Sequence, residues 1–172
     1  MLSFLNKLKF KSFIKRNFIS NNISNNLGQS AFETNINPSF SKTYSPERPA
    51  KLITSRVKLL NSLGKKHKDI MTDSNLPKST YTRIINDFTL NNLPKKENII
   101  KLAIGLEFNL SQTIYILNSY GYTLTNSSKL DVTCKYFFAN WKYKKNERGT
   151  GKGIYTFQLL LSEWSNINVM ER

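Results

Sequence analysis

The stretch Ile70-Met-Thr-Asp-Ser-Asn-Leu-Pro-Lys-Ser-Thr-Tyr-Thr-Arg-Ile-Ile-Asn86 predicts two short helices joined by a tight turn, the arrangement of a helix-turn-helix. Asn75 suits the turn because Asn tolerates a left-handed backbone, and Pro77 suits the first turn of the second helix. Ser74 is small enough to let the second helix approach the first closely. The alternative interpretation is an ordinary helical hairpin whose polar face is merely solvated.

The second helix is expected to have one buried and one exposed face. Tyr81, Ile84 and Ile85 recur at helical spacing and are expected to be buried. The side chains left pointing outward are Lys78, Ser79, Thr82, Arg83 and Asn86. These residue types supply most of the groups that pair with base edges or phosphates, so the helix at 77–87 is a candidate DNA-reading element.

Composition and charge narrow the class of partner. The chain has 172 residues, 39% of them apolar, and a net charge of +15. One modest core is therefore expected, with a polyanionic partner: nucleic acid first, an anionic membrane surface second. The single cysteine, Cys134, excludes an internal disulfide and lies on an apolar stripe, where a buried structural thiol is expected. His67, the only histidine, lies in the basic run 65–68 and is expected to be solvated or to face a phosphate.

No group of residues has the spacing of a catalytic or metal site. The sequence shows no paired carboxylates in an apolar setting, no metal-ligand spacing and no nucleophile with a plausible base. We therefore expect neither an enzyme nor a protein that holds a metal or a cofactor.

The first fifty residues are expected to be a basic targeting-like segment followed by a disordered linker. No acidic residue precedes Glu33, and lysines interleave with apolar residues over 1–18. This pattern is typical of a mitochondrial transit peptide, so residues 1–20 point to the mitochondrial matrix, and whether 1–18 are cleaved stays open. The alternatives are a disordered basic arm that grips phosphates and a helix lying on a membrane surface; the apolar run is too short for stable membrane insertion. Residues 20–50 show no apolar period.

Apolar residues at helical spacing predict a compact all-α bundle of five to six helices over residues 51–141. The first helix is expected to end near Gly64. Ser111 is expected to cap the fifth helix, and Ser128 with Asp131 has the spacing of a capping box before the sixth. The residues expected to face the core in the later helices are Ile99, Leu102, Ala103, Leu106, Ile114, Leu117, Tyr120, Leu130, Cys134, Phe137 and Trp141.

Residues 142–172 are expected to form a basic linker and a short amphipathic tail helix. The glycine-rich segment 149–153 is not a P-loop, because the G-x-x-x-x-G-K-[ST] spacing is absent and Gly153 stands where the magnesium-binding hydroxyl belongs. A flexible linker is expected there. The tail helix is expected to dock on the domain or on a partner subunit through Phe157, Leu160, Leu161 and Trp164.

The order of these elements resembles a known family, the lambda-repressor-like helix-turn-helix domains of Cro and repressor type. The best-matching pieces are Leu76-Pro-Lys-Ser-Thr-Tyr-Thr-Arg-Ile-Ile-Asn86 and Pro94-Lys-Lys-Glu-Asn-Ile-Ile-Lys-Leu-Ala103. The continuation through 110–138 resembles an extension of small bacterial regulators, so the resemblance covers residues 52–140. It implies a transcriptional regulator that reads the major groove of double-stranded DNA.

The resemblance also assigns roles by position. It places base contacts at Lys78, Ser79 and Arg83 and a phosphate contact at Lys68. The chain departs from the family after residue 86, where Asp87-Phe88 replaces an Asn-Gly-type exit, and beyond residue 141. Family members often dimerise, which leaves a homodimer open, and a bacterial cytoplasmic location competes with the matrix. The alternative function is a structural or RNA-associated component of an organellar ribosome or nucleoid, without sequence-specific DNA readout.

Overall fold

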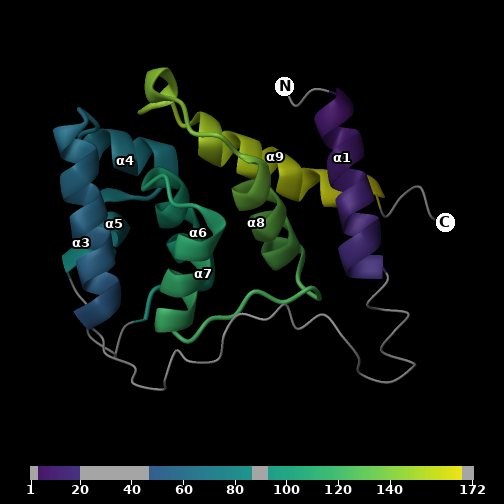
Figure 1. Cartoon of the computed structure of the whole chain (residues 1–172), viewed down its shortest axis with the longest axis horizontal. Coiled ribbons are helices and arrows are strands. Elements are labelled where there is room, and N and C mark those ends of the chain that lie inside the picture. Colours follow the sequence, from purple (N-terminus) through teal and green to yellow (C-terminus); the bar gives the residue numbers. More distant parts are fainter. Residues whose placement is uncertain (1–3, 20–46, 87–92, 168–172) are drawn as a thin grey trace.

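The computed structural model describes residues 4–19, 47–86 and 93–167, and all regular structure within these ranges is helical (Figure 1). The prediction of an all-α fold is confirmed, and six helices cover the region for which five to six were predicted. In chain order the elements are α1 (Phe4–Ile14), the π-helical segment η1 (Lys15–Ile19), α3 (Glu47–Ser62), α4 (His67–Ser74), α5 (Lys78–Asn86), α6 (Lys96–Gly105), α7 (Leu110–Ser119), α8 (Lys129–Asn140), the 3-10 turn η3 (Lys145–Glu147) and α9 (Lys152–Ile167).

The turn between α4 and α5 has the geometry that its sequence predicts. Asn75 adopts the left-handed conformation, with φ 48° and ψ 44°. The amides of Asn75 and Leu76 donate to the carbonyl groups of Thr72 and Met71 and so satisfy the end of α4. Leu76 is buried, and the carbonyl of Pro77 accepts the amide of Tyr81 to start α5.

The close approach of α6 to α4 depends on two small residues. A Cβ atom on Gly105 would lie 2.6 Å from the carbonyl oxygen of Ile70 and 2.9 Å from Cβ of Ser74, so glycine alone fits this contact. Ser74 was predicted to make room for α5, which is wrong: the buried Ser74 makes room for α6. The physical reason is the turn after α4, which directs α5 towards α3 instead (Figure 1).

Two predicted helix caps are wrong in detail. Asn109, not Ser111, caps α7. Its side chain accepts a hydrogen bond from the amide of Gln112 at 2.9 Å, and the Gln112 side chain accepts one from the amide of Asn109 at 3.0 Å. The buried face of α7 accordingly contains Thr113 and Ile116 besides Leu117, whereas Ile114 is only half-buried.

The second wrong cap is at α8. Ser128 is the N-cap by position, but its side chain makes no cap hydrogen bond. Asp131 is 1% exposed and accepts the amide of Thr125 at 2.9 Å, and its other oxygen pairs with Lys96 at 2.6 Å. A buried carboxylate is stable only with such partners, so Asp131 binds Thr125 and Lys96 instead of completing a capping box with Ser128.

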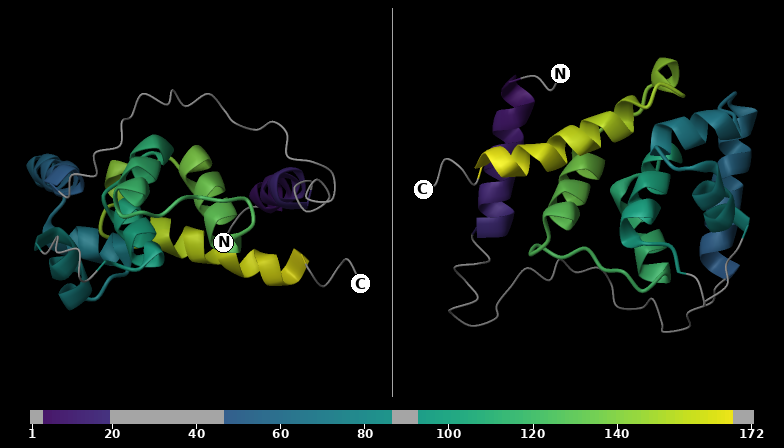
Figure 2. Two further views of the ribbon diagram at one scale, coloured as in Figure 1. Left: turned by 90° about the horizontal axis from the view of Figure 1, so that it is seen from below. Right: turned by 180° about the vertical axis from the view of Figure 1, so that it is seen from behind.

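The tail helix, α9, docks on the domain; the sequence had left open whether it packs there or on a partner subunit. Figure 2 shows α9 lying across α8 and α1. Phe157, Leu160 and Trp164 are buried, and the indole N–H of Trp164 donates to the hydroxyl of Thr133 at 2.8 Å. The docking leaves Tyr155 on the outer side of α9, 56% exposed.

The N-terminal residues 4–14 form a helix that packs on the domain. Phe10 and Ile14 of α1 are buried, and the ring of Phe10 lies 4.8 Å from that of Tyr136 and 6.3 Å from that of Trp164. The predicted linker over 20–50 ends earlier than expected, since α3 begins at Glu47; residues 20–46 lie outside the described residues. Pro49 is tolerated in the first turn of α3, where its missing N–H removes no helical hydrogen bond. Within the described ranges, no helix is long and apolar enough to span a membrane.

Candidate nucleic-acid interface

Helix α5 has the two faces that its sequence predicts. Tyr81 and Ile84 are buried, with exposed fractions of 4% and 1%, and Ile85 is half-buried. The five residues predicted to face outward are all exposed; they are Lys78, Ser79, Thr82, Arg83 and Asn86. The predicted contact face is therefore presented to solvent at the edge of the molecule, beside α3 (Figure 1).

A side-chain hydrogen bond ties α5 to the start of α4. The Nδ1 atom of His67 lies 2.7 Å from the hydroxyl of Tyr81, and the two rings meet edge to face. Burial raises the pKa of Tyr81 to about 12, so the phenol stays protonated at neutral pH. Its hydroxyl donates to Nδ1 in the imidazole tautomer that lacks a proton there and accepts from Nδ1 in the other. His67 was predicted to be solvated or to face a phosphate; its ring also holds α5 against α4. The two residues are 14 positions apart in the sequence, so no local pattern predicts this pair.

The predicted phosphate contact, Lys68, lies on the first turn of α4 and is exposed. Lys66, immediately before α4, is exposed too, whereas Asp69 accepts the Lys66 amide at 2.8 Å and is half-buried. The short turn that joins α4 to α5 thus places Lys68 and the α5 face on one connected pair of helices. Asp87, where the chain departs from the family pattern, lies outside the described residues.

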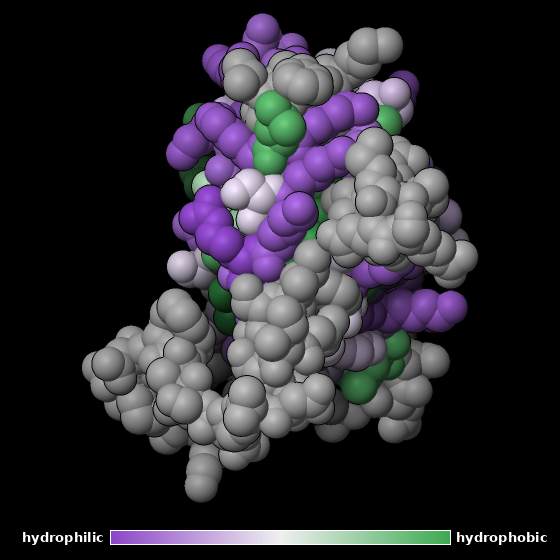
Figure 3. Space-filling view, turned by 90° about the vertical axis from the view of Figure 1, so that its right-hand side faces the viewer, coloured by the Kyte–Doolittle hydropathy of each residue, from purple (hydrophilic) through white to green (hydrophobic). Residues whose placement is uncertain are grey.

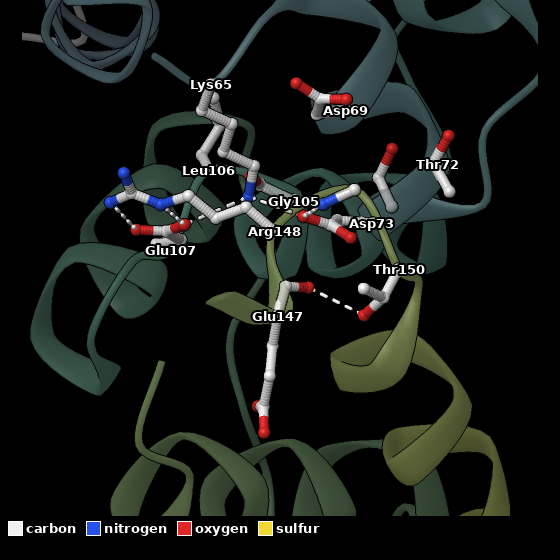
Figure 4. A network of polar contacts seen from close by, with 12 residues as sticks. Lys65, Asp69, Thr72, Asp73, Gly105, Leu106, Glu107, Glu147, Arg148 and Thr150 are labelled. Carbon is white, nitrogen blue, oxygen red and sulfur yellow. Dashed lines mark hydrogen bonds and ion pairs between the residues drawn. The ribbon is translucent and has the colours of Figure 1, made fainter. Parts of the chain in front are cut away.

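Lys65 does not belong to the exposed basic run. Its side chain is 1% exposed, and Nζ lies 2.8 Å from the carbonyl oxygen of Gly105, 2.7 Å from Asp73 and 3.1 Å from Glu107 (Figure 4). A buried ammonium group is stable only with such partners. Lys65 therefore holds α4 and α6 together and is not available to a phosphate.

The carboxylate of Glu107 also binds the C-terminal part of the chain. Arg148 donates to its two oxygens at 2.8 and 2.9 Å, in the paired geometry that guanidinium favours. Burial alone would raise the pKa of Glu107, but hydrogen bonds from Arg148 and Lys65 outweigh it and hold the pKa below the usual value. Two cations and two carboxylates, Lys65, Arg148, Asp73 and Glu107, thus form one ion cluster (Figure 4).

The glycine-rich segment 149–153 was predicted to be a flexible linker, which is wrong, because it binds Asp73. The amides of Gly149 and Gly151 donate to the two oxygens of that carboxylate, each at 2.9 Å. Both glycines have positive φ values, 73° and 70°, which turn their N–H groups towards one anion. The anion is a carboxylate of the protein itself. This explains in physical terms why a P-loop-like composition here does not create a phosphate site.

Cys134 is buried and lies on the core face of α8, as predicted for a structural thiol. Burial, with the nearby Asp131 carboxylate, raises the pKa of its thiol far above the usual range, so it stays protonated. Among the described residues, no three His, Cys, Asp or Glu side chains come together in a way that could hold a metal ion.

No family model matches the chain, and no significant similarity to a curated protein or to a solved structure was found. The resemblance to lambda-repressor-like domains therefore stays a prediction. The candidate interface is defined by what the structure places on it: an exposed polar and cationic face on α5, a buried opposite face, and Lys68 on the preceding helix.

Proposed function

We propose that this protein binds double-stranded DNA with α5 in the major groove and Lys68 on the phosphate backbone, and that it acts as a transcriptional regulator. The observation that carries the proposal is the exposure of all five outward residues of α5 while Tyr81 and Ile84 fix the opposite face in the core. In a helix-turn-helix the recognition helix packs on the domain through one side and presents the other to the major groove.

Different side chains of α4 and α5 are expected to supply affinity and sequence specificity. Arg83 carries a planar fork of donors that matches two acceptors of guanine, whereas Lys78 offers a single point charge. A phosphate contact from Lys68 adds affinity for every sequence and makes binding depend on salt. A good bidentate contact from Arg83 contributes about 1–3 kcal/mol of discrimination, roughly a 5- to 150-fold preference.

The test compares three single variants on two kinds of duplex. A preferred duplex is selected from a random pool with the full chain, and binding to it and to a random duplex is then measured at several salt concentrations. Lys68→Ala is expected to weaken both equally and to reduce the slope of log K against log salt by about 0.9. Arg83→Ala is expected to lower the ratio between the two duplexes by roughly 5- to 150-fold. Lys129→Ala, which removes one exposed charge outside α4 and α5, is the matched control.

Two outcomes would contradict the proposal. Equal losses on both duplexes for Arg83→Ala would show that α5 does not read sequence. Preferential binding of structured RNA in competition with the selected duplex would favour the alternative, an RNA-associated component.

A further inference from the structure

Residues 142–151 join α8 to α9 and are here called the connector. Four of them are lysine or arginine and one, Glu147, is acidic. Glu147 pairs with Lys152 at 2.5 Å, and Arg148 belongs to the ion cluster. The Lys145 side chain is exposed and, within the described ranges, has no ion-pair or hydrogen-bond partner. Lys145 is therefore available to an anion from outside the chain.

Charge alone does not single out the connector. Hydrophilic residues also cover most of the described surface at the end of the molecule that α1 forms, which faces the viewer in Figure 3. The other exposed residues of the connector are polar as well: Lys142, Lys144, Asn146 and Thr150. A membrane surface, which takes up apolar side chains, therefore does not fit it. What distinguishes the connector is the element on which it packs.

That element is α4. The amides of Gly149 and Gly151 donate to the carboxylate of Asp73, each at 2.9 Å. A Cβ atom on Gly149 would lie 2.7 Å from Oδ1 of Asp69, and one on Gly151 would lie 3.5 Å from the carbonyl oxygen of Thr72. The backbone of the connector thus lies directly against one side of α4.

Lys145 lies one turn before these contacts. The amide of Arg148 donates to the carbonyl of Lys145 at 3.4 Å, and Nη1 of Arg148 donates to the carbonyl of Leu63, shortly before α4, at 3.2 Å. A 3-10 helix rises about 2.0 Å per residue, so Lys145 and Arg148 are about 6 Å apart along the turn. In Figure 4 the side chain of Glu147 extends away from α4. The backbone of Lys145 is therefore fixed near the first half of α4, which carries Lys68.

The helical repeat of α4 places Lys68 between α5 and the connector. Successive residues of an α-helix are about 100° apart around its axis, so Lys68 lies at about 100° from His67. By the same count Asp69 lies at about 200° and Asp73 at about 240°. His67 bonds to α5, whereas Asp69 and Asp73 contact the connector. The exposed Lys68 therefore has α5 on one side and the connector on the other.

We propose that Lys145 binds a phosphate of the same duplex that α5 reads, on the flank beyond the phosphate held by Lys68. This inference rests on the proposed function of α4 and α5. Duplex DNA carries one negative charge per about 1.7 Å of its axis, so the backbone that passes Lys68 continues away from α5 towards the connector. Contacts to phosphate carry no sequence information, so Lys145 lengthens the bound site without changing sequence preference.

The first test measures binding of the full chain to the selected and the random duplex at several salt concentrations. Lys145→Gln is expected to reduce the slope of log K against log salt by about 0.9 on both duplexes. The ratio of wild-type to variant affinity is then expected to fall about 3.5-fold between 50 and 200 mM salt. The matched control, Lys129→Gln, removes one exposed charge at the start of α8 and is expected to leave the slope unchanged. Circular dichroism establishes that both variants fold.

The second test locates the contact along the duplex. The selected duplex is shortened from each end in turn, one base pair at a time. On one flank, removal of the outermost phosphates is expected to abolish the difference between wild type and Lys145→Gln, while Lys68→Ala still weakens binding. Shortening from the other end is expected to preserve that difference.

The third test asks whether the connector acts through its attachment to α4. Asp73→Asn removes one of the two carboxylate oxygens that hold Gly149 and Gly151. In this background, at a temperature where circular dichroism shows it folded, Lys145→Gln is expected to change the salt slope by less than it does in wild type. An equal change in both backgrounds contradicts the fixed placement of Lys145.

The outcomes separate this inference from the proposed function. If Lys145→Gln leaves the slope unchanged while Lys68→Ala reduces it, or if both ends of the duplex respond alike, the inference is wrong and the function of α5 is untouched. If Lys145→Gln weakens binding to structured RNA but not to the duplex, the inference is again wrong. If Lys68→Ala and Arg83→Ala both leave duplex binding unchanged, the proposed function fails and the shared duplex fails with it.

Discussion

The replacement Asp73→Asn tests whether the buried ion cluster holds the two parts of the chain together. The Asp73 carboxylate forms an ion pair with Nζ of Lys65 at 2.7 Å and accepts hydrogen bonds from the amides of Gly149 and Gly151, each at 2.9 Å. Asn has one acceptor oxygen, so at least one of these donors loses its partner, and Glu107 becomes the only carboxylate beside Lys65. Removing one partner of a buried ion pair costs about 3–5 kcal/mol. We expect a loss near the low end, about 3 kcal/mol, because Glu107 and the Gly105 carbonyl still contact Lys65.

The assay is urea unfolding followed by tryptophan fluorescence and far-ultraviolet circular dichroism. The matched control is Glu97→Gln, which breaks the 2.7 Å ion pair between the exposed Glu97 and the half-buried Lys101 within α6. That change is expected to lower the free energy of unfolding by no more than about 0.5 kcal/mol. A double-mutant cycle with Lys65→Met isolates the pairwise term, expected at about 1–3 kcal/mol.

Trypsin provides a local readout in the same variant, because it cleaves after Lys144, Lys145 and Arg148. Releasing the glycine segment from Asp73 is expected to speed cleavage at these sites more than global unfolding does. A free energy of unfolding within about 0.5 kcal/mol of wild type, or strict additivity in the cycle, would refute the reasoning that the cluster is a coupled unit.

Three further changes test particular contacts. Gly105→Ala is expected to lower the melting temperature through a cost of about 1–3 kcal/mol, since its Cβ would meet the Ile70 carbonyl at 2.6 Å; an unchanged value contradicts the packing of α6 on α4. Tyr143→Phe is expected to leave the free energy of unfolding in urea unchanged or raise it by up to about 1 kcal/mol, because the buried hydroxyl has no hydrogen-bond partner among the described residues. The pKa of Glu107 is held below its usual 4.5, so its carboxylate stabilises the fold fully above that value. That stability is expected to disappear as the pH falls through the lower folded pKa, and Glu107→Gln should flatten this acid part of the stability profile in urea titrations.

Features that depend on neighbours along the chain were predicted correctly. Asn75 is left-handed because a short polar side chain tolerates that conformation, and α5 exposes Arg83 because Tyr81 and Ile84 recur at the helical period. The burial of Phe157 and Trp164 on one side of α9 follows from the same periodicity, whereas the sequence left open whether that side packs on the domain or on a partner subunit. Each of these needs only local geometry.

Features that depend on distant partners were missed. Nothing in the run 65–68 distinguishes Lys65 from its neighbours, since the groups that make its burial possible, Asp73 and Glu107, come from other elements. The sequence predicted a flexible segment where Gly149 and Gly151 bind a carboxylate 76 and 78 residues earlier. Pairing across such separations is decided by packing, and periodicity does not report it.

The sequence by itself determined an all-helical chain, the α4 to α5 turn and the residues that α5 exposes, because the helical repeat and backbone preferences act over a few residues. Only the tertiary structure decided that Ser74 faces α6, that Lys65 is buried among carboxylates and that α1 joins the core through Phe10. The physical reason is that buried charge and close packing are satisfied only by groups brought together in space, whatever their distance along the chain.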